Sequence, residues 1–257
     1  MVPRNIEQDN ELFEGKRYES IVSVYFKEVP MLWLSSLENK EKLLSYFEQI
    51  ECVPSTKAVI LYELNGSLDQ KRYFELYDWW RESGIYSDAI RRIYNAIDQV
   101  MLRIVNSSKI FISVQSGKVI LPFFTSNFAC DYRIVADNLV VQNPAPKVGK
   151  VPNGACAYFL TRILGPTKAE DILLSSKGIN AYELLRLKLV DKVVSFNKLS
   201  SAALDIAKKF SDKSDTSLVG VKRLVNYSLK DLKDYLEYEN EQLIKIFNKT
   251  KPKNKRV

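Results

Sequence analysis

The chain has 257 residues, 46% apolar and 27% charged, which suits one globular domain of good size. Its net charge is +7, but the last nine residues carry +5 of it, which argues against a nucleic-acid-binding face and for a solvated tail. Histidine is absent, so the commonest general base and the commonest transition-metal ligand are missing. The three cysteines are not clustered, which predicts neither disulfides nor a metal site. The N-terminus is polar, and no apolar run reaches the roughly 18 residues of a membrane span. We therefore expect a cytoplasmic protein.

The first half of the chain alternates strands with helices, as judged from the period of its apolar residues. In chain order we expect strands over 18–26 and 31–34, a helix over 38–50, a strand over 57–64, a turn at Asn65-Gly66, helices over 70–82 and 87–106, a strand over 110–114 and a loop at Ser116-Gly117. A short helix over 123–130 should precede two strands near 132–135 and 139–141.

The second half is mainly helical. A loop over 147–150 leads to Asn153, a plausible N-cap for a helix that runs to Leu164. The remaining elements are helices over 167–175 and 229–247 and a strand over 192–195. Strands alternating with helices, followed by helices alone, predict an α/β core over 1–195. Residues 196–257 form a C-terminal helical region with the basic tail, which packs on the core or on a neighbouring subunit.

Four stretches in the middle of the chain share their order and spacing with one known family. These stretches are A-C-D-Y-R-I-V-A at 129–136, N-P through V-G-K-V-P at 143–152, Y-F-L-T-R-I-L-G-P-T-K-A and I-L-L-S within 158–175, and I-N-A-Y-E-L-L-R-L-K-L-V-D at 179–191. Together they resemble the enoyl-CoA hydratase/isomerase (crotonase) superfamily, with Lys188 where glycine is usual. The resemblance covers about residues 20–247 and implies a ClpP/crotonase-like spiral of ββα units.

The resemblance implies binding of an acyl thioester whose carbonyl oxygen receives two backbone N–H groups, the oxyanion hole. The first donor aligns with Leu68, with Ser67 as a neighbour that could substitute, although Asn65-Gly66 is equally a signal for a tight turn. The second donor aligns with Pro122, which has no N–H, so Phe123 at the start of the following helix is the remaining candidate. Bulky side chains here replace three glycines of the family and would lie where the thioester binds.

The carboxylates that the family uses for proton transfer are not at their aligned positions. The two glutamates align with Thr125 and Ala145, and an aspartate of some isomerases and dehalogenases aligns with Asn153. An amide cannot act as a base, and we favour a helix-capping role for Asn153. We therefore expect no ordinary hydration of an enoyl thioester.

Other groups could replace these carboxylates. Lys147 could pair with a substrate carboxylate or a coenzyme A phosphate, although such a lysine usually faces solvent. Tyr158, Tyr62 and Glu63 lie in segments near the expected cavity. Cys130 belongs to a buried block, where thiols are inert.

Two hypotheses stay open. The first is a divergent enzyme, a lyase or isomerase by family, that decarboxylates, isomerises or hydrolyses an acyl group carried by coenzyme A or by an acyl-carrier protein, with no further cofactor. The second is a non-catalytic crotonase-like protein that binds a ligand or serves as an assembly subunit. In both cases the resemblance implies a homotrimer or hexamer.

Overall fold

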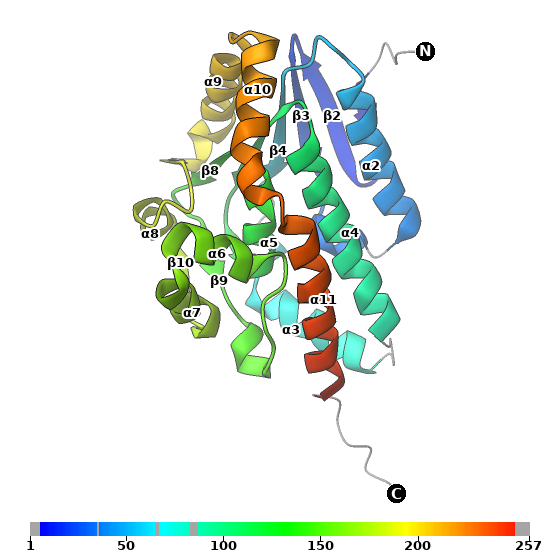
Figure 1. Ribbon diagram of the computed structural model, residues 1–257, viewed down its shortest axis with the longest axis vertical. Coiled ribbons are helices and arrows are strands. Elements are labelled where there is room, and N and C mark those ends of the chain that lie inside the picture. Colours follow the sequence, from blue (N-terminus) through cyan, green and yellow to red (C-terminus); the bar gives the residue numbers. More distant parts are fainter. Residues whose placement is uncertain (1–5, 35, 65–66, 83–86, 250–257) are drawn as a thin grey trace, which may run out of the picture.

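The computed structural model describes residues 6–34, 36–64, 67–82 and 87–249, and two β-sheets form its centre (Figure 1). In the described residues the larger sheet has the strand order β1-β2-β3-β4-β6-β8-β11 and the smaller one the order β10-β9-β7-β5. The strands are β1 (Gln8–Asp9), β2 (Phe13–Tyr18), β3 (Ile21–Phe26), β4 (Ala58–Glu63), β5 (Ser67–Leu68), β6 (Ile110–Gln115), β7 (Lys118–Ile120), β8 (Tyr132–Ala136), β9 (Val140–Gln142), β10 (Ile179–Asn180) and β11 (Lys192–Val194).

The chain passes repeatedly from the larger sheet to the smaller one. Strands β4, β6 and β8 are parallel neighbours in the larger sheet, and each is followed in sequence by a short strand of the smaller sheet, β5, β7 or β9. Only β1, β2 and β3 pair in antiparallel fashion within the larger sheet as described. This repeated step is the spiral of strand pairs that the sequence resemblance implies.

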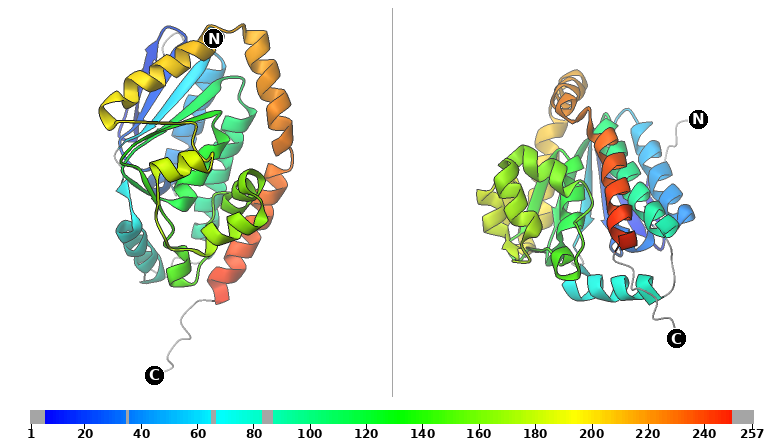
Figure 2. Two further views of the ribbon diagram at one scale, coloured as in Figure 1. Left: turned by 90° about the vertical axis from the view of Figure 1, so that its left-hand side faces the viewer. Right: turned by 60° about the horizontal axis from the view of Figure 1, so that its bottom comes forward.

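The parallel strands of the larger sheet are mostly apolar because helices cover both of their faces (Figure 2). On one face Val59 and Leu61 of β4 pack in the same cluster as Phe47 of α2 (Leu37–Glu51). On the other face Ile60 packs with Ala203 of α9 (Leu199–Ser211). Successive residues of β4 thus serve two separate cores.

Further helices complete the molecule. These are α1 (Pro30–Trp33), α3 (Gln70–Glu82), α4 (Ser87–Asn106), α5 (Leu121–Ser126), α6 (Cys156–Leu164), α7 (Pro166–Leu174), α8 (Ala181–Arg186), α10 (Asp215–Asn226) and α11 (Leu232–Lys249), with 3-10 turns η1 (Asn127–Ala129), η2 (Ala145–Val148), η3 (Phe196–Lys198) and η4 (Tyr227–Leu229). In the described part of the chain, no helix is both long and apolar enough to cross a membrane.

The C-terminal helices pack on the core of their own chain. Helix α11 lies along α4, as Figure 1 shows. Lys222 of α10 is buried, and its ammonium group donates to the carbonyl oxygens of Ile104 and Lys109 and lies 2.8 Å from the Asp131 carboxylate. These contacts hold α10 at the end of α4.

The structure corrects three of the predicted elements. The strand predicted over 18–26 is instead the hairpin of β2 and β3, because Glu19 has a positive φ of 53° and reverses the chain. The strand predicted over 31–34 is helix α1, which begins with Pro30 in its first turn, where a proline costs no hydrogen bond. The loop predicted over 147–150 is in part the 3-10 turn η2. The predicted turn at Asn65-Gly66 lies outside the described residues.

Candidate functional site

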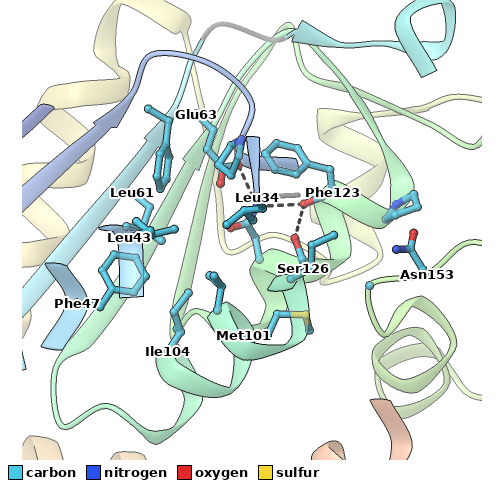
Figure 3. Close-up of a pocket in the computed structure, with 17 residues that line it drawn as sticks. Leu34, Leu43, Phe47, Leu61, Glu63, Met101, Ile104, Phe123, Ser126 and Asn153 are labelled. Carbon is cyan, nitrogen blue, oxygen red and sulfur yellow. Dashed lines mark hydrogen bonds between the residues drawn. The ribbon is translucent and has the colours of Figure 1, made fainter. Parts of the chain in front are cut away.

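An apolar cavity of about 50 Å³ lies between α2, α4, the end of β4 and the start of α5 (Figure 3). Most of its wall consists of apolar side chains from the helices and the sheet, among them Leu43, Phe47, Leu61, Val100, Met101 and Ile104. Its polar lining residues are Glu63, Ser126, Asn127 and Asn153. A cavity with apolar walls and a few polar groups at one side is the usual form of a small-molecule site.

Glu63 brings a carboxyl group to this cavity from the last position of β4. Its Oε2 accepts hydrogen bonds from the amide nitrogens of Gln115 (2.6 Å) and Asn127 (3.0 Å). Gln115 is the last residue of the neighbouring strand β6, and both amides are buried. The carboxyl is therefore held at the carboxyl ends of two parallel strands, where open α/β sheets bind their ligands.

The surroundings of Glu63 favour its neutral form. Burial raises its pKa to about 8, although the hydrogen bonds from Gln115 and Asn127 act in the opposite direction. In the described part of the cavity wall, Glu63 is also the one residue with an ionisable side chain. A carboxyl that changes its charge near neutral pH, in a cavity, can give or take a proton.

The start of α5 forms the part of the wall next to Glu63. Pro122 and Phe123 both line the cavity, and Pro122 lies in the first turn of the helix. The Phe123 N–H belongs to the same turn, where backbone donors have no acceptor within the helix. Its carbonyl oxygen accepts from Ser126 Oγ (2.9 Å) and from the Asn127 amide (3.2 Å). Helix α5 starts two residues earlier than predicted and passes into η1 at Asn127.

Thr125 and Ala145, where the family glutamates align, are buried and do not line the cavity. The Thr125 hydroxyl lies 3.1 Å from the carbonyl oxygens of both Leu121 and Gly154 and 2.9 Å from Cys156 Sγ. It thereby joins α5 to the turn before α6.

Asn153 lines the cavity, and its predicted capping role is wrong. Helix α6 begins only at Cys156, and its N-cap is Ala155, which has a left-handed backbone (φ 56°) and no side-chain cap bond. The reason is the preceding Gly154, whose φ of 72° turns the chain and where a Cβ would lie only 2.6 Å from the Pro122 carbonyl oxygen. The Asn153 side chain is thus left facing the cavity (Figure 3).

The remaining predicted site residues lie at different places. Ser67 and Leu68 form β5, whose backbone pairs with β7. Lys147 is exposed, and its ammonium group donates to Gln70 Oε1 (3.0 Å). Tyr158 is buried, does not line the cavity, and donates its hydroxyl to Asp231 (2.7 Å).

A second buried carboxyl cluster lies between α4 and α11. Glu239 of α11 accepts the backbone N–H of Ala155 (3.1 Å) and the hydroxyl of Tyr235 (3.3 Å). Asp98 of α4 accepts from the Asn240 amide (2.6 Å). Burial raises the pKa of both Glu239 and Asp98 to about 7. Among the described residues no three histidine, cysteine or acidic side chains come together as a metal site would require.

The spiral of strand pairs, with helices over both faces of the larger sheet, defines a crotonase-type α/β protein. The family model for enoyl-CoA hydratase/isomerase matches residues 36–256, and the chain therefore belongs to that family. The family and the fold predicted from the sequence are both confirmed.

Solved structures agree with this assignment at the level of the fold. The chain is similar to an enoyl-CoA hydratase from Bacillus halodurans (20% identity, TM-score 0.79, 92% of this chain and 95% of that one). It is also similar to an enoyl-CoA hydratase/isomerase from Xanthobacter autotrophicus (19% identity, TM-score 0.77, 93% and 88%).

Curated relatives match over about half of this chain. The fatty acid oxidation complex subunit alpha of Psychrobacter cryohalolentis is 29% identical over 125 residues, which are 48% of this chain but 17% of that protein. The short-chain-enoyl-CoA hydratase of Clostridium acetobutylicum is 28% identical over 121 residues, 47% of this chain and 46% of that protein. The matched part thus spans less than half of either relative.

Proposed function

We propose that this chain binds an acyl thioester, with a short and uncharged acyl group in the cavity beside Glu63. The observation that carries this proposal is the cavity itself, which is lined by apolar side chains together with one carboxyl and three uncharged polar side chains. Names of relatives in the same family refer to enoyl-CoA substrates, which supports the substrate class. We propose the Phe123 N–H at the cavity wall as a donor to the thioester carbonyl, whereas Leu68, predicted as the other donor, belongs to β5 and does not line the cavity as described.

The size and charge of the cavity select the acyl group. The cavity has a volume of about 50 Å³. One water-sized group needs about 10 to 15 Å³, so the cavity holds roughly three to five such groups. This corresponds to the non-hydrogen atoms of an acyl group between acetyl and butyryl. In the described part of the wall there is no lysine or arginine to pair with a second carboxylate, and an unpaired buried charge is costly. We therefore favour proton transfer on a neutral acyl group over decarboxylation of an acidic one.

Binding can be tested by thermal unfolding of the full chain with butyryl-CoA, free coenzyme A, and a butyryl group on an acyl-carrier protein. A ligand at 100 times its dissociation constant stabilises by about 2.7 kcal/mol, which raises the melting temperature by about 5–11 °C. A rise with butyryl-CoA that free coenzyme A does not reproduce supports the proposal. A rise with the carrier-protein form alone assigns that carrier, and no rise with either thioester contradicts the proposal.

A matched pair of variants locates the binding site. Val100→Phe adds an aromatic ring at the cavity wall and should abolish the stabilisation by butyryl-CoA. Leu174→Phe adds a ring at a residue that is 78% exposed and should leave the stabilisation unchanged. Equal stabilisation of both variants would place the acyl group elsewhere.

The alternative function, a non-catalytic assembly subunit, is favoured by a separate feature. Helix α10 and the turn after it expose four large apolar side chains, Val221, Leu224, Val225 and Tyr227. Exposed apolar clusters of this kind are typical of subunit contacts. We propose that this face contacts a second copy of the chain in a homotrimer or hexamer.

Light scattering after size-exclusion chromatography measures this assembly. Leu224→Glu should shift the wild-type oligomer to a monomer while the secondary structure stays intact. A monomeric wild-type chain, or an unchanged Leu224→Glu oligomer, would contradict assembly through this face.

A further inference from the structure

We propose that Glu63 is the proton-transfer group of the site, and that it removes and returns a proton on the carbon next to the thioester carbonyl. This inference rests on the proposed acyl-thioester binding and adds the group that performs the chemistry. The family glutamate positions, Thr125 and Ala145, supply no carboxyl. Glu63 reaches the cavity from a different element, the end of β4.

The hydrogen bonds of Glu63 divide its two oxygens between different tasks. Both amide donors, from Gln115 and Asn127, point at Oε2. Among the described residues Oε1 has no hydrogen-bond partner. Since Oε2 already accepts two donors, Oε1 is the oxygen with lone pairs available for a proton. The carboxyl is thus held through Oε2 at the cavity wall, and Oε1 is the oxygen without a partner among the described residues.

Asn127 places this carboxyl in the same network as the start of α5. Its amide nitrogen donates to Glu63 Oε2 (3.0 Å) and to the Phe123 carbonyl oxygen (3.2 Å), as the dashed lines in Figure 3 show. The Phe123 backbone is the proposed binding point of the thioester carbonyl. A thioester bound there would present its α-carbon to the space that Glu63 lines.

The charges around Glu63 allow it to act as a base near neutral pH. Its pKa of about 8 means that a tenth of the molecules carry the carboxylate at about pH 7. The nearby Cys130 thiol stays neutral because burial raises its pKa far above the usual range. In the described part of the cavity wall there is no lysine or arginine that would lock Glu63 in its charged form.

The chemical step needs no further reactant. The Glu63 carboxylate takes the α-proton; the C–H bond breaks, an O–H bond forms, and the electron pair moves onto the thioester oxygen as an enolate. The proton on the carboxyl exchanges with solvent and returns to the α-carbon. In heavy water the α-carbon therefore gains deuterium without net reaction. With an unsaturated acyl group, return of the proton to the γ-carbon shifts the double bond.

A purely structural role for Glu63 is the competing explanation. In that role the carboxyl would only join β4 to β6 and η1, and its removal would affect folding rather than proton exchange. The two roles predict different dependences of the exchange rate on pH. If Glu63 transfers the proton, the rate follows the titration of its carboxyl. If Glu63 only supports the structure, the rate does not follow that titration.

The experiment measures deuterium incorporation into butyryl-CoA by the full-length protein in heavy water, by mass spectrometry, with binding measured in parallel by calorimetry. Wild-type exchange should rise about tenfold for each pH unit below 8 and level off above it. Glu63→Gln, which has the same shape, should bind butyryl-CoA as the wild type does and lose exchange by about a hundredfold or more. Asp98→Asn, the same change at a buried carboxyl away from the cavity, should exchange as the wild type does.

A third variant tests the orientation of the carboxyl. Gln115→Leu removes a donor that lowers the pKa of Glu63, so the pH at which exchange levels off should rise. This readout uses a variant with Glu63 intact and remains informative if Glu63→Gln does not fold.

The outcomes separate the two proposals. If butyryl-CoA does not bind the wild type, the proposed function fails and this inference fails with it. If it binds without exchange, or if exchange is independent of pH between 6 and 8, or if Glu63→Gln exchanges normally, the role of Glu63 is refuted while acyl-thioester binding stands.

Discussion

Two groups of carboxyls in this protein, one half-buried and one buried, have similarly raised pKa values and different surroundings. Glu63 lies at the end of β4, and Glu239 lies with Asp98 between α11 and α4. Burial raises the pKa in each case, to about 8 for Glu63 and about 7 for the other two. Glu239 uses both oxygens, one for the Ala155 N–H and one for the Tyr235 hydroxyl. Glu63 leaves one oxygen without a partner among the described residues, next to a cavity.

This difference in hydrogen bonding distinguishes a reactive carboxyl from a structural one, which a raised pKa alone does not do. Burial raises the pKa of any carboxyl, whether it supports the structure or reacts with a ligand. An oxygen that faces a cavity can meet a ligand, whereas one that accepts a backbone N–H stabilises that backbone. Glu239 should therefore matter mainly for stability and Glu63 mainly for chemistry.

The largest stability effect expected is that of Glu239→Ala. The change leaves the Ala155 N–H without its acceptor and creates a void between α11 and α6, at a cost of about 3 kcal/mol. Urea denaturation at pH 6 measures it. Glu63→Gln, measured under the same conditions, should change the free energy of unfolding by less than about 1 kcal/mol. If Glu63→Gln destabilises as strongly as Glu239→Ala, the contrast between the two groups fails.

Gly154→Ala tests the turn that lies between the two carboxyl groups. A Cβ at Gly154 would come within 2.6 Å of the Pro122 carbonyl oxygen, and the residue already has a φ of 72°. We expect a loss of about 2–3 kcal/mol and weaker binding of butyryl-CoA. Gly149→Ala is the matched control, because Gly149 has a φ of 65° but a Cβ there meets nothing within 4 Å. Equal losses would show that backbone strain alone accounts for the effect.

The pH dependence of the free energy of unfolding distinguishes the two groups, because their carboxyls lose their protons over different pH ranges. The folded-state pKa values of Glu63, Asp98 and Glu239 lie above those of free carboxyls. The folded state therefore binds more protons than the unfolded one from about pH 4 upward, and the free energy of unfolding falls as pH rises through the folded-state values.

Denaturation at a series of pH values should show a decline of about 1–2 kcal/mol or more between pH 5 and 8. Glu239→Gln should remove part of the decline below about pH 7, and Glu63→Gln should remove part of the decline that extends to about pH 8. Stability that rises over this range would contradict both shifts.

The smallest effect expected is that of Tyr235→Phe, which removes the hydroxyl 3.3 Å from Glu239. A hydrogen bond of this length should contribute about 0.5–1 kcal/mol. Deuterium exchange into butyryl-CoA should stay at the wild-type rate. A large loss of exchange would mean that the α11 cluster takes part in the chemistry.

Much of the fold could be predicted from the sequence because its long elements have clear periods. The predicted ranges of α3 and α4 agree with the structure, and β4 differs from its prediction by one residue at each end. The strand predicted near 139–141 is β9 of the smaller sheet, but β5, β7 and β10 were missed, because two or three residues such as those of β10 show no period. Helix α1 was missed because its four apolar residues also fit a strand, and only Pro30 marks a helix start.

The candidate site was harder to predict. Pro122, Phe123 and Asn153 were located by alignment, and all three line the cavity. The partners of Glu63 could not be found in this way, because Gln115 and Asn127 meet it only through the pairing of β4 with β6 and the position of η1. One signal was available, since both Glu63 and Gln115 are polar residues at the ends of apolar strands.

The bond from Ala155 to Glu239 affects how the chain can be divided. Residues 6–195 include every side chain that lines the cavity, so they look like a self-sufficient ligand-binding unit. The turn at Gly154 nevertheless depends on an acceptor that lies far along the sequence, in α11. A fragment that ends before α11 would retain the binding residues and lose the acceptor that holds one wall of the cavity. The last helix thus supports the proposed ligand site although none of its side chains lines the cavity as described.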